Sequence, residues 1–318
     1  MQFNKLISIV IPAYNETENI PKICSQIEIL FENLSYQYEI ILVSDGCTDN
    51  TMEIIDELIS RNEQIFYIRF SRNFGHQLAL KAGMDHATGD CIISLDCDLQ
   101  HPPDIIPQLI KKWEEGYEVV YTIRQEDKKL SLGKRLSSKL FYKFLNSLTD
   151  VEIESGSADF RLLDKSVVSV LRNFHENEPF LRGLVKWIGF KQTSVSYYPN
   201  AREFGQSKYS LKKMIRFALQ GVTSFSIRPL YLAIYLGFIF SLLSLMYIPY
   251  VLYTIHIGKE VSGWASTIMT IAFFGGLQLI ILGIIGIYVG KLFMQIKNRP
   301  NYIIRSTNIK SQKHFDIA

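Results

Sequence analysis

The sequence predicts an α/β domain built on a mostly parallel sheet, followed by two transmembrane helices. Two observations support the first part: short apolar runs alternate with segments of helical periodicity, and each run ends in a cluster of polar residues. The second part follows from two long apolar runs in the last third of the chain. The net charge of +3 over 318 residues is too close to balance to indicate a nucleic-acid partner. The four cysteines include no Cys-x-x-Cys pair, which argues against a structural zinc site.

Each apolar run is short and rich in β-branched residues, as in the strands of a parallel sheet. The expected strands are residues 5–12, 38–43, 64–70, 90–95 and 117–122, and a strand-rich stretch at 180–197 is expected to complete the sheet. Asn15 or Thr17 is expected to cap the first helix. Because the carboxyl ends of parallel strands meet at one rim of a sheet, the polar clusters are expected to lie close together.

The central candidate site follows the fourth strand, where Asp96 and Asp98 stand two residues apart. A strand that ends in Asp-x-Asp presents hard oxygen ligands at the rim of the sheet. Mg²⁺ is commonly held by one or two carboxylates together with substrate phosphates. Acidic pairs are also common in surface turns, so the pair by itself leaves both interpretations open.

Two further clusters favour a nucleotide site at the same rim. After the first strand, Tyr14 can stack on a base and Glu16 can accept hydrogen bonds, and after the second strand Asp45 can accept hydrogen bonds from a ribose. The alternative is that Asp45 only begins an Asp-Gly turn and that Asn15 only caps a helix. The convergence of three clusters on one rim favours nucleotide binding.

Asp159 is the candidate of the second half of the chain. It lies in a segment of small residues, 155–162, where Gly156 permits a close approach of the backbone. The structural alternative for this acid is an ion pair with Arg161. The cation-rich segment 128–144 suggests an anionic partner, but its lysines and arginines can equally form a solvated helix face.

The last third of the chain predicts membrane attachment. Residues 209–228 have the pattern of an amphipathic helix at a membrane surface, and residues 230–254 and 266–290 are each long enough to cross a hydrocarbon core. Cations flank both apolar runs, whereas the loop between them carries one lysine balanced by one glutamate. The positive-inside rule therefore places both termini in the cytoplasm, including a C-terminal tail at 294–318. A buried hairpin of a soluble protein is the alternative.

Three motifs carry a resemblance to a known family. They are Ile9-Val10-Ile11-Pro12-Ala13-Tyr14-Asn15-Glu16, Ser44-Asp45-Gly46-Cys47-Thr48-Asp49, and Asp96-Cys97-Asp98-Leu99-Gln100-His101-Pro102-Pro103. With these motifs the chain resembles glycosyltransferase family 2, and within it the polyprenyl-phosphate glycosyltransferases such as dolichyl-phosphate mannose synthases and bactoprenol glucosyltransferases. The resemblance implies a GT-A-type, Rossmann-like catalytic domain over residues 1–208, ahead of an interfacial helix at 209–228 and a transmembrane hairpin at 229–293.

The resemblance also implies roles for individual residues. The implied nucleotide-sugar contacts are Pro12, Tyr14, Asn15, Glu16, Val43, Asp45, Asp96, Cys97, Asp98, Arg124, Arg202 and Lys208. The implied ligands of Mg²⁺ or Mn²⁺ are Asp96, Asp98 and Gln100. The implied contacts of the acceptor phosphate are Arg135, Ser137, Arg202 and Lys208, and the implied catalytic residues are Asp159, Asp98, Arg124, Arg202 and Lys208.

For Asp159 the resemblance implies a base at the acceptor, but a phosphate monoester is already mostly a dianion at neutral pH. Orienting the acceptor or holding a cation is therefore an equally good role for this acid.

The implied reaction is inverting transfer of a sugar from a nucleotide sugar to undecaprenyl or another polyprenyl phosphate at the plasma membrane. UDP-glucose and UDP-N-acetylglucosamine are favoured over GDP-mannose as donors, and the resemblance implies a homo-oligomer, a tetramer in relatives. A processive polysaccharide synthase is one alternative, but its Gln-x-x-Arg-Trp motif is absent from the sequence. A membrane-anchored nucleotide-binding scaffold without turnover is the other.

Overall fold

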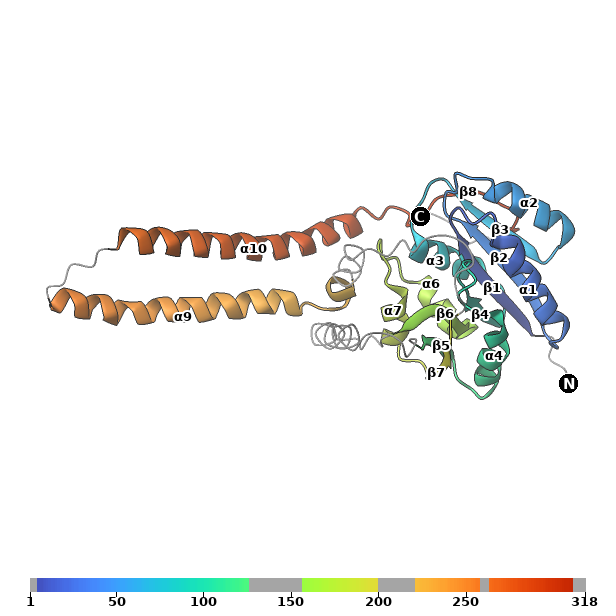
Figure 1. Cartoon of the computed structure of the whole chain (residues 1–318), viewed down its shortest axis with the longest axis horizontal. Helices are drawn as coiled ribbons and strands as arrows, with labels where there is room; N and C mark the ends of the chain where they lie inside the picture. Colours follow the sequence, from blue (N-terminus) through green and yellow to red (C-terminus); the bar gives the residue numbers. More distant parts are fainter. Residues whose placement is uncertain (1–4, 126–155, 200–220, 258–262, 311–318) are drawn as a thin grey trace. The chain divides into compact units, whose positions relative to one another are not determined.

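The computed structural model describes residues 5–125, 156–199, 221–257 and 263–310 (Figure 1). The backbone divides into two compact units. The first comprises residues 1–146, 151–214 and 299–318, and the second comprises residues 147–150 and 215–298. The first unit contains the sheet, and the second contains two long apolar helices.

The described part of the first unit is built on an eight-stranded sheet in the order β7-β5-β6-β4-β1-β2-β3-β8. The strands are β1 (Leu6–Ala13), β2 (Gln37–Ser44), β3 (Ile65–Phe70), β4 (Cys91–Ser94), β5 (Val119–Arg124), β6 (Ser157–Asp164), β7 (Gln192–Tyr197) and β8 (Ile304–Thr307). The run β4-β1-β2-β3 is parallel and β5 pairs with β7 in parallel, whereas β6 and β8 are antiparallel to their neighbours. The expected α/β fold with a mostly parallel sheet is confirmed.

Helices cover both faces of the sheet (Figure 1). Helices α1 (Ile20–Glu32), α2 (Thr51–Arg61) and α4 (Ile106–Glu114) contribute to one hydrophobic core with the β1 residues Ile7, Ile9 and Ile11. Because side chains alternate along a strand, Val10 faces the other way. There it meets α3 (His76–His86), where a Cβ built on Gly83 would lie 2.1 Å from Val10 Cγ1. This close contact fixes the height of α3 over the sheet.

Shorter helices also belong to the described part of the first unit. The 3₁₀ turn η1 (Pro103–Ile105) precedes α4, and α6 (Lys165–Arg172) follows β6. Arg172 of α6 donates to the carbonyl oxygens of Met84 and Ala87, at 3.2 and 2.6 Å, and so joins α6 to the end of α3.

Two local expectations are wrong. Helix α1 has Asn19 as its N-cap, so neither Asn15 nor Thr17 caps it, and Pro21 lies in its first turn, where a missing N–H is harmless. The stretch 180–197 is less rich in strand than expected, because α7 (Leu181–Trp187) occupies its first half, although β7 does form one edge of the sheet as predicted. The buried residues of α7 include Leu181, Leu184 and Val185, a spacing that buries one face of a helix.

The chain returns to the sheet after the apolar helices. Strand β8 pairs with β3, the Tyr302 ring stacks on Phe70 with centroids 5.2 Å apart, and the Tyr302 hydroxyl donates to Asp85 at 3.0 Å. Asn308 Oδ1 accepts a hydrogen bond from the Tyr67 amide at 2.7 Å. The segment expected to be a C-terminal tail thus contributes an edge strand to the sheet, which its sequence pattern does not indicate.

The second unit contains α9 (Arg228–His256) and α10 (Trp264–Ile296). The two helices contact each other through Phe240, whose ring lies 5.7 Å from that of Phe273 and 5.5 Å from that of Phe274. Two apolar helices that contact each other are therefore present among the described residues.

Within the described residues, one helical stretch is long and apolar enough to cross a membrane, judged by length and composition. It is Thr267–Ile296 of α10, with a mean hydropathy of 2.3. The corresponding apolar stretch of α9, Arg228–Leu243, is shorter. The expected pair of transmembrane helices therefore stays a prediction. Most of the interfacial helix expected at 209–228 lies outside the described residues.

Candidate active site

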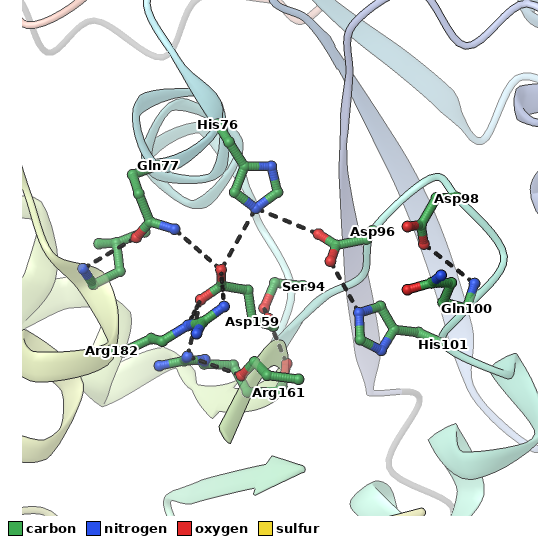
Figure 2. A network of polar contacts seen from close by, with 12 residues as sticks. His76, Gln77, Ser94, Asp96, Asp98, Gln100, His101, Asp159, Arg161 and Arg182 are labelled. Carbon is green, nitrogen blue, oxygen red and sulfur yellow. Dashed lines mark hydrogen bonds and ion pairs between the residues drawn. The ribbon is translucent and has the colours of Figure 1, made fainter. Parts of the chain in front are cut away.

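Polar side chains from the end of β4, from β6 and from the start of α3 meet at one rim of the sheet (Figure 2). Asp96 follows β4, and Asp159 lies near the start of the neighbouring strand β6, where the Ser94 hydroxyl donates to the Asp159 carbonyl oxygen. His76, the first residue of α3, stands between the two acids. Its Nε2 lies 3.3 Å from Asp96 Oδ1 and 3.6 Å from Asp159 Oδ2. The imidazole therefore links the two carboxylates into one network.

Asp159 is enclosed by cationic and polar donors. Arg182 Nε and Nη2 each lie 2.9 Å from a different carboxylate oxygen, Arg161 Nη2 lies 3.1 Å from Oδ1, and Gln77 Nε2 lies 3.1 Å from Oδ2. Burial favours the neutral acid, but the two guanidinium groups and His76 hold the pKa of Asp159 well below its ordinary value. Asp159 is therefore ionised, and the expected alternative of an ion pair with Arg161 is present.

Asp96 has one oxygen fixed by a hydrogen bond. His101 Nε2 lies 2.9 Å from Asp96 Oδ2, and His101 Nδ1 lies 2.6 Å from the Tyr197 hydroxyl. The other oxygen, Oδ1, is buried and accepts no hydrogen bond from the described residues, although His76 lies within ion-pair distance. Burial raises the pKa of Asp96, but His76 and His101 outweigh it and lower the pKa below its ordinary value. One ionised oxygen of Asp96 therefore has only the charge of His76 beside it and keeps its capacity to accept.

The network carries an excess of positive charge. Desolvation lowers the pKa of His76, but the charges of Asp96 and Asp159 outweigh it and raise the pKa to about 9. At neutral pH the cluster therefore holds three cations, His76, Arg161 and Arg182, against two anions. Because His76 is 44% exposed at the rim, this excess positive charge can be reached from solvent. It favours the binding of an anionic group such as a phosphate.

The loop after Asp96 folds on itself and reaches β5. Leu99 adopts a left-handed conformation with φ 58°, and Asp98 Oδ1 accepts the Gln100 amide at 3.2 Å. Arg124, at the end of β5, donates from Nη1 to Gln100 Oε1 at 3.3 Å. Four of the predicted residues, Asp96, Asp98, Gln100 and Arg124, are therefore brought to one place.

These residues fit a divalent cation in combination with a bound ligand. Among the described residues, no group of three or more His, Cys, Asp or Glu side chains is placed to hold a metal ion on its own. The unbonded oxygen of Asp96, with the Asp98 carboxylate and the Gln100 amide close by in the chain, offers hard oxygen donors. Mg²⁺ often takes few protein ligands and completes its shell with phosphates and water.

Asp45 holds the backbone that leads to His76. Its carboxylate is 3% exposed and accepts hydrogen bonds from the Phe74 amide at 2.6 Å and the Gly75 amide at 3.0 Å. Burial, which these two donors offset only in part, raises the pKa of Asp45. The acid predicted to contact a ribose thus first of all positions the start of α3.

The loops after β1 and β2 are joined to each other. Asn15 Oδ1 accepts the Thr48 amide at 2.9 Å, Asn15 Nδ2 donates to Thr48 Oγ1 at 3.2 Å, and the Glu16 amide donates to Thr51 Oγ1 at 3.1 Å. Tyr14, between β1 and this junction, is 40% exposed. The arrangement leaves an aromatic ring at the rim, where a base can stack.

Comparison of the sequence with known proteins shows the family to which the chain belongs. Residues 8–172 match the family described as Glycosyl transferase family 2. The chain is 41% identical over 301 residues to an uncharacterized glycosyltransferase, YkcC, of Bacillus subtilis, covering 94% of this chain and 93% of the relative. It is 37% identical over 303 residues to the bactoprenol glucosyl transferase of Shigella phage SfII, covering 95% and 98%. The chain belongs to glycosyltransferase family 2.

A prophage bactoprenol glucosyl transferase homolog of Escherichia coli is 38% identical over 300 residues and covers 94% of this chain and 98% of its own. Among solved structures, a mannosyltransferase of Pyrobaculum calidifontis in complex with GDP-mannose and Mn²⁺ aligns with a TM-score of 0.49 at 13% identity, covering 70% of this chain and 64% of the other. The three relatives found by sequence match this glycosyltransferase along almost its whole length, including the apolar helices.

Not every residue implied by the family lies in the described site. Pro12 and Val43 are buried partners in the register of β1 and β2, so they form the floor beneath the loops. Cys97 is 4% exposed and belongs to the hydrophobic core, so its thiol is not a ligand-facing group. Burial raises the pKa of this thiol well above its ordinary value, which keeps it protonated. The implied residues outside the described ranges are Arg135, Ser137, Arg202 and Lys208.

Several residues of the site were not predicted from the sequence. They are His76, Gln77, Arg182, His101 and Tyr197. Two of them carried a usable signal: His76 begins the helix after the third polar cluster, and His101 belongs to the quoted Asp96–Pro103 motif. Arg182 and Tyr197 gave none, because their positions depend on how α7 and β7 fold back toward the rim.

Proposed function

We propose that this glycosyltransferase moves a sugar from a nucleotide sugar to the phosphate of a polyprenol at the cytoplasmic face of the membrane, with inversion at the anomeric carbon. UDP-glucose and UDP-N-acetylglucosamine are the proposed donors, and undecaprenyl phosphate is the proposed acceptor. One observation carries the proposal: a rim with an ionised, unbonded carboxylate oxygen and an excess of cations occurs in the same chain as two long apolar helices.

The donor half of the proposal rests on the loops at the ends of β1, β2 and β4. Tyr14 is exposed where a base can stack, and Asp96, Asp98 and Gln100 supply oxygen ligands for Mg²⁺ or Mn²⁺. When bound, such a cation would neutralise charge on the departing diphosphate. Arg124, held on Gln100, adds a fixed positive charge beside it.

The acceptor half rests on the excess of cations around Asp159. A phosphate monoester is mostly a dianion at neutral pH, so it needs electrostatic steering more than deprotonation. Asp159 is already ionised and occupied by Arg161, Arg182 and Gln77. We therefore assign Asp159 the role of holding cations in place for the acceptor, in preference to the role of a base.

Exposure of the apolar helices supports a lipid environment. The apolar window of Thr267–Ile296 is 0% buried, and single side chains such as Leu279, at 70%, and Ile296, at 81%, are open to the surroundings. A buried hairpin of a soluble protein would cover such side chains, so that alternative is disfavoured. The relatives named bactoprenol glucosyl transferases support a polyprenol as the lipid that carries the acceptor phosphate.

The connectivity of the sheet supports two membrane crossings. Strand β7 lies before the apolar helices and β8 lies after them, and both belong to the same sheet. If α10 crosses the bilayer, the chain must cross once more to bring β8 back to that sheet. The charged segment 200–220 is unsuited to crossing hydrocarbon, so α9 is the proposed second span.

The test uses the purified full-length protein in lipid nanodiscs with Mg²⁺ or Mn²⁺. UDP-glucose, UDP-N-acetylglucosamine and GDP-mannose are each incubated with undecaprenyl phosphate, and the lipid product is identified by mass spectrometry. We expect a single added sugar from a UDP donor, no product from undecaprenol without its phosphate, and loss of product in Asp98→Asn.

Each alternative has its own result. Products with many sugars would indicate a processive synthase, and absence of UDP or GDP release with every donor would leave a nucleotide-binding scaffold. Full activity of Asp98→Asn would contradict the proposed metal site.

A further inference from the structure

A chain of three side chains runs from the end of β7 to the carboxylate of Asp96. The Tyr197 hydroxyl lies 2.6 Å from His101 Nδ1, and His101 Nε2 lies 2.9 Å from Asp96 Oδ2. Tyr197 is 2% exposed and His101 is 6% exposed, so water does not compete for these hydrogen bonds. Neither residue was assigned a role by the sequence motifs.

The two hydrogen bonds of the His101 ring fit one tautomer of a neutral imidazole. An ionised carboxylate only accepts, so His101 Nε2 carries the hydrogen that it donates to Asp96. A neutral imidazole then has a free lone pair on Nδ1, which accepts the hydrogen of the Tyr197 hydroxyl. Tyr197 thereby selects the tautomer of His101 that fixes Asp96 Oδ2.

The imidazole is also held by packing. The Phe160 ring lies 5.5 Å from the His101 ring and 6.1 Å from the Tyr197 ring, and the His101 and Tyr197 rings are themselves 5.5 Å apart. The left-handed turn at Leu99 brings His101 back over Asp96, five positions earlier in the chain. His101 therefore has little freedom to turn away from the carboxylate.

We propose that Tyr197 and His101 are positioning residues that orient Asp96 toward a divalent cation. With Oδ2 engaged by His101, the carboxylate presents Oδ1, the oxygen without a hydrogen bond in the described structure, to the cation. Partners of this kind, which hold a metal ligand through its other atom, typically contribute 10- to 100-fold to metal affinity, so about that range is expected here. The proposal rests on the proposed function, because it concerns the cation of that same site.

The test measures Mn²⁺ binding instead of turnover. Mn²⁺ is titrated into the full-length protein with UDP, and free Mn²⁺ is followed by electron paramagnetic resonance. We expect His101→Ala to weaken binding about 10- to 100-fold and Tyr197→Phe to weaken it by an amount near the lower end of that range. His101→Gln, which keeps an amide donor near the place of Nε2, is expected to restore part of the loss. Tyr198→Phe is the matched control, because Tyr198 is 66% exposed next to Tyr197.

A double-mutant cycle separates positioning from simple packing. If Tyr197 acts through His101, Tyr197→Phe will cause no further loss of Mn²⁺ affinity in the His101→Ala background. Additive losses, or unchanged affinity in folded Tyr197→Phe, would overturn the proposal. Should His101→Ala fail to fold, the same cycle is run on His101→Gln, where the Tyr197 hydroxyl has lost its Nδ1 acceptor. Wild-type protein that binds no Mn²⁺ in the presence of UDP would instead contradict the metal site of the proposed function.

Discussion

Two buried carboxylates at the rim, Asp45 after β2 and Asp159 in β6, are balanced in different ways. Asp45 is 3% exposed and its oxygens accept two neutral backbone amides. Asp159 is 5% exposed and contacts Arg161 and Arg182. The pKa of Asp45 is raised and that of Asp159 is lowered, although both acids are buried to almost the same extent.

The difference shows that burial alone does not set the charge of a site. Backbone amides are dipoles and recover part of the lost hydration of a carboxylate, whereas guanidinium groups add a full opposite charge. The Asp45 region is accordingly a device for holding loops together. The Asp159 region holds fixed charges of both signs, which the proposed function assigns to binding an anionic reactant.

The largest expected effect comes from Asp159→Asn. Removing the anion leaves Arg161 buried and Arg182 half-buried without their counter-charge, which typically costs about 3 to 5 kcal/mol of unfolding free energy when a buried pair is broken. We expect a large drop in the melting temperature and loss of sugar transfer, measured by calorimetry in detergent and by UDP release.

Arg182→Gln provides the matched comparison, because it removes one of the two guanidinium groups and leaves Arg161 in contact with Asp159. It is expected to lose activity with a smaller change in stability. A melting temperature of Asp159→Asn equal to that of wild type would contradict the claim that Asp159 balances the charges of Arg161 and Arg182.

Gly46→Ala is expected to have the next largest effect, because it distorts the loop beside Asp45. Gly46 has φ +67°, and an added Cβ would lie 2.4 Å from Arg72 C and Asn73 N. Left-handed strain costs about 1 to 2 kcal/mol and overpacking about 1 to 3 kcal/mol, so a loss of about 3 kcal/mol is expected. Chemical unfolding measures it.

Gly189→Ala is the control for strain without contact, since Gly189 has φ +75° and nothing within 4 Å of an added Cβ. The difference between the two variants isolates the close approach of the loops after β2 and β3. Equal losses in both would show that the approach carries no cost.

The fold was largely predictable from the sequence because its signals are local. The β-branched runs that became β1 to β4 carry their period and their polar ends within a few residues, and their bounds differ from the expected ones by at most one residue. Strand β8 was not predictable, because its four residues gain their role only by pairing with β3. Helix α7 was missed for a similar reason, since it is only seven residues long.

The candidate site was predictable where one motif carried its chemistry. Asp96, Asp98 and Gln100 lie within one loop, and Arg124, which the resemblance assigned to the same nucleotide-sugar site, meets that loop through Gln100. The partners of Asp159 were only partly predictable, because Gln77 and Arg182 come from α3 and α7, which are 82 and 23 positions away in the chain. Such distant neighbours decide whether a carboxylate acts as a general base, accepts hydrogen bonds that hold a loop, or forms ion pairs with arginines.

Asp45→Asn tests whether the hydrogen bonds from Asp45 to the Phe74 and Gly75 amides hold the loop before α3. An asparagine keeps one acceptor oxygen but turns an NH₂ group toward one of the two amides, so one buried donor loses its partner. Such a loss costs about 1 to 3 kcal/mol, and we expect a decrease of about 2 kcal/mol in unfolding free energy. UDP affinity should fall as well, because the start of α3 loses its anchor, and isothermal titration measures this.

The two acids are expected to give opposite pH dependence. The folded pKa of Asp45 is raised above 3.8, so its ionisation costs stability, and the advantage of wild type over Asp45→Asn shrinks as pH rises from about 4 through the folded pKa. The folded pKa of Asp159 lies well below 3.8, so its contribution is complete above that value and is lost only as pH falls through the folded pKa.

Between pH 4 and about 8 the contribution of Asp159 should stay constant while that of Asp45 declines by about 1.4 kcal/mol for each unit of its pKa shift, and unfolding of the wild type and both variants over this range measures the difference. Parallel curves for the two variants would contradict the opposite signs.

Asn15→Ala is expected to have the smallest effect, and it asks whether the joined loops stabilise the fold or serve the ligand. Asn15 is exposed, and its side chain accepts the Thr48 amide at 2.9 Å and donates to the Thr48 hydroxyl at 3.2 Å. An exposed hydrogen bond of this kind contributes about 0.5 to 1 kcal/mol, and alanine is also less suited than asparagine to the φ of 57° at this position. We therefore expect a loss of about 1 kcal/mol in stability together with a rise in KM for the nucleotide sugar at nearly unchanged kcat, because the loop beside Tyr14 becomes less ordered.

Asn15→Gly separates the loss of the hydrogen bonds from the strain of the left-handed conformation. It removes the same side chain but accepts the left-handed conformation, so it should recover part of the stability and leave KM as high as in Asn15→Ala.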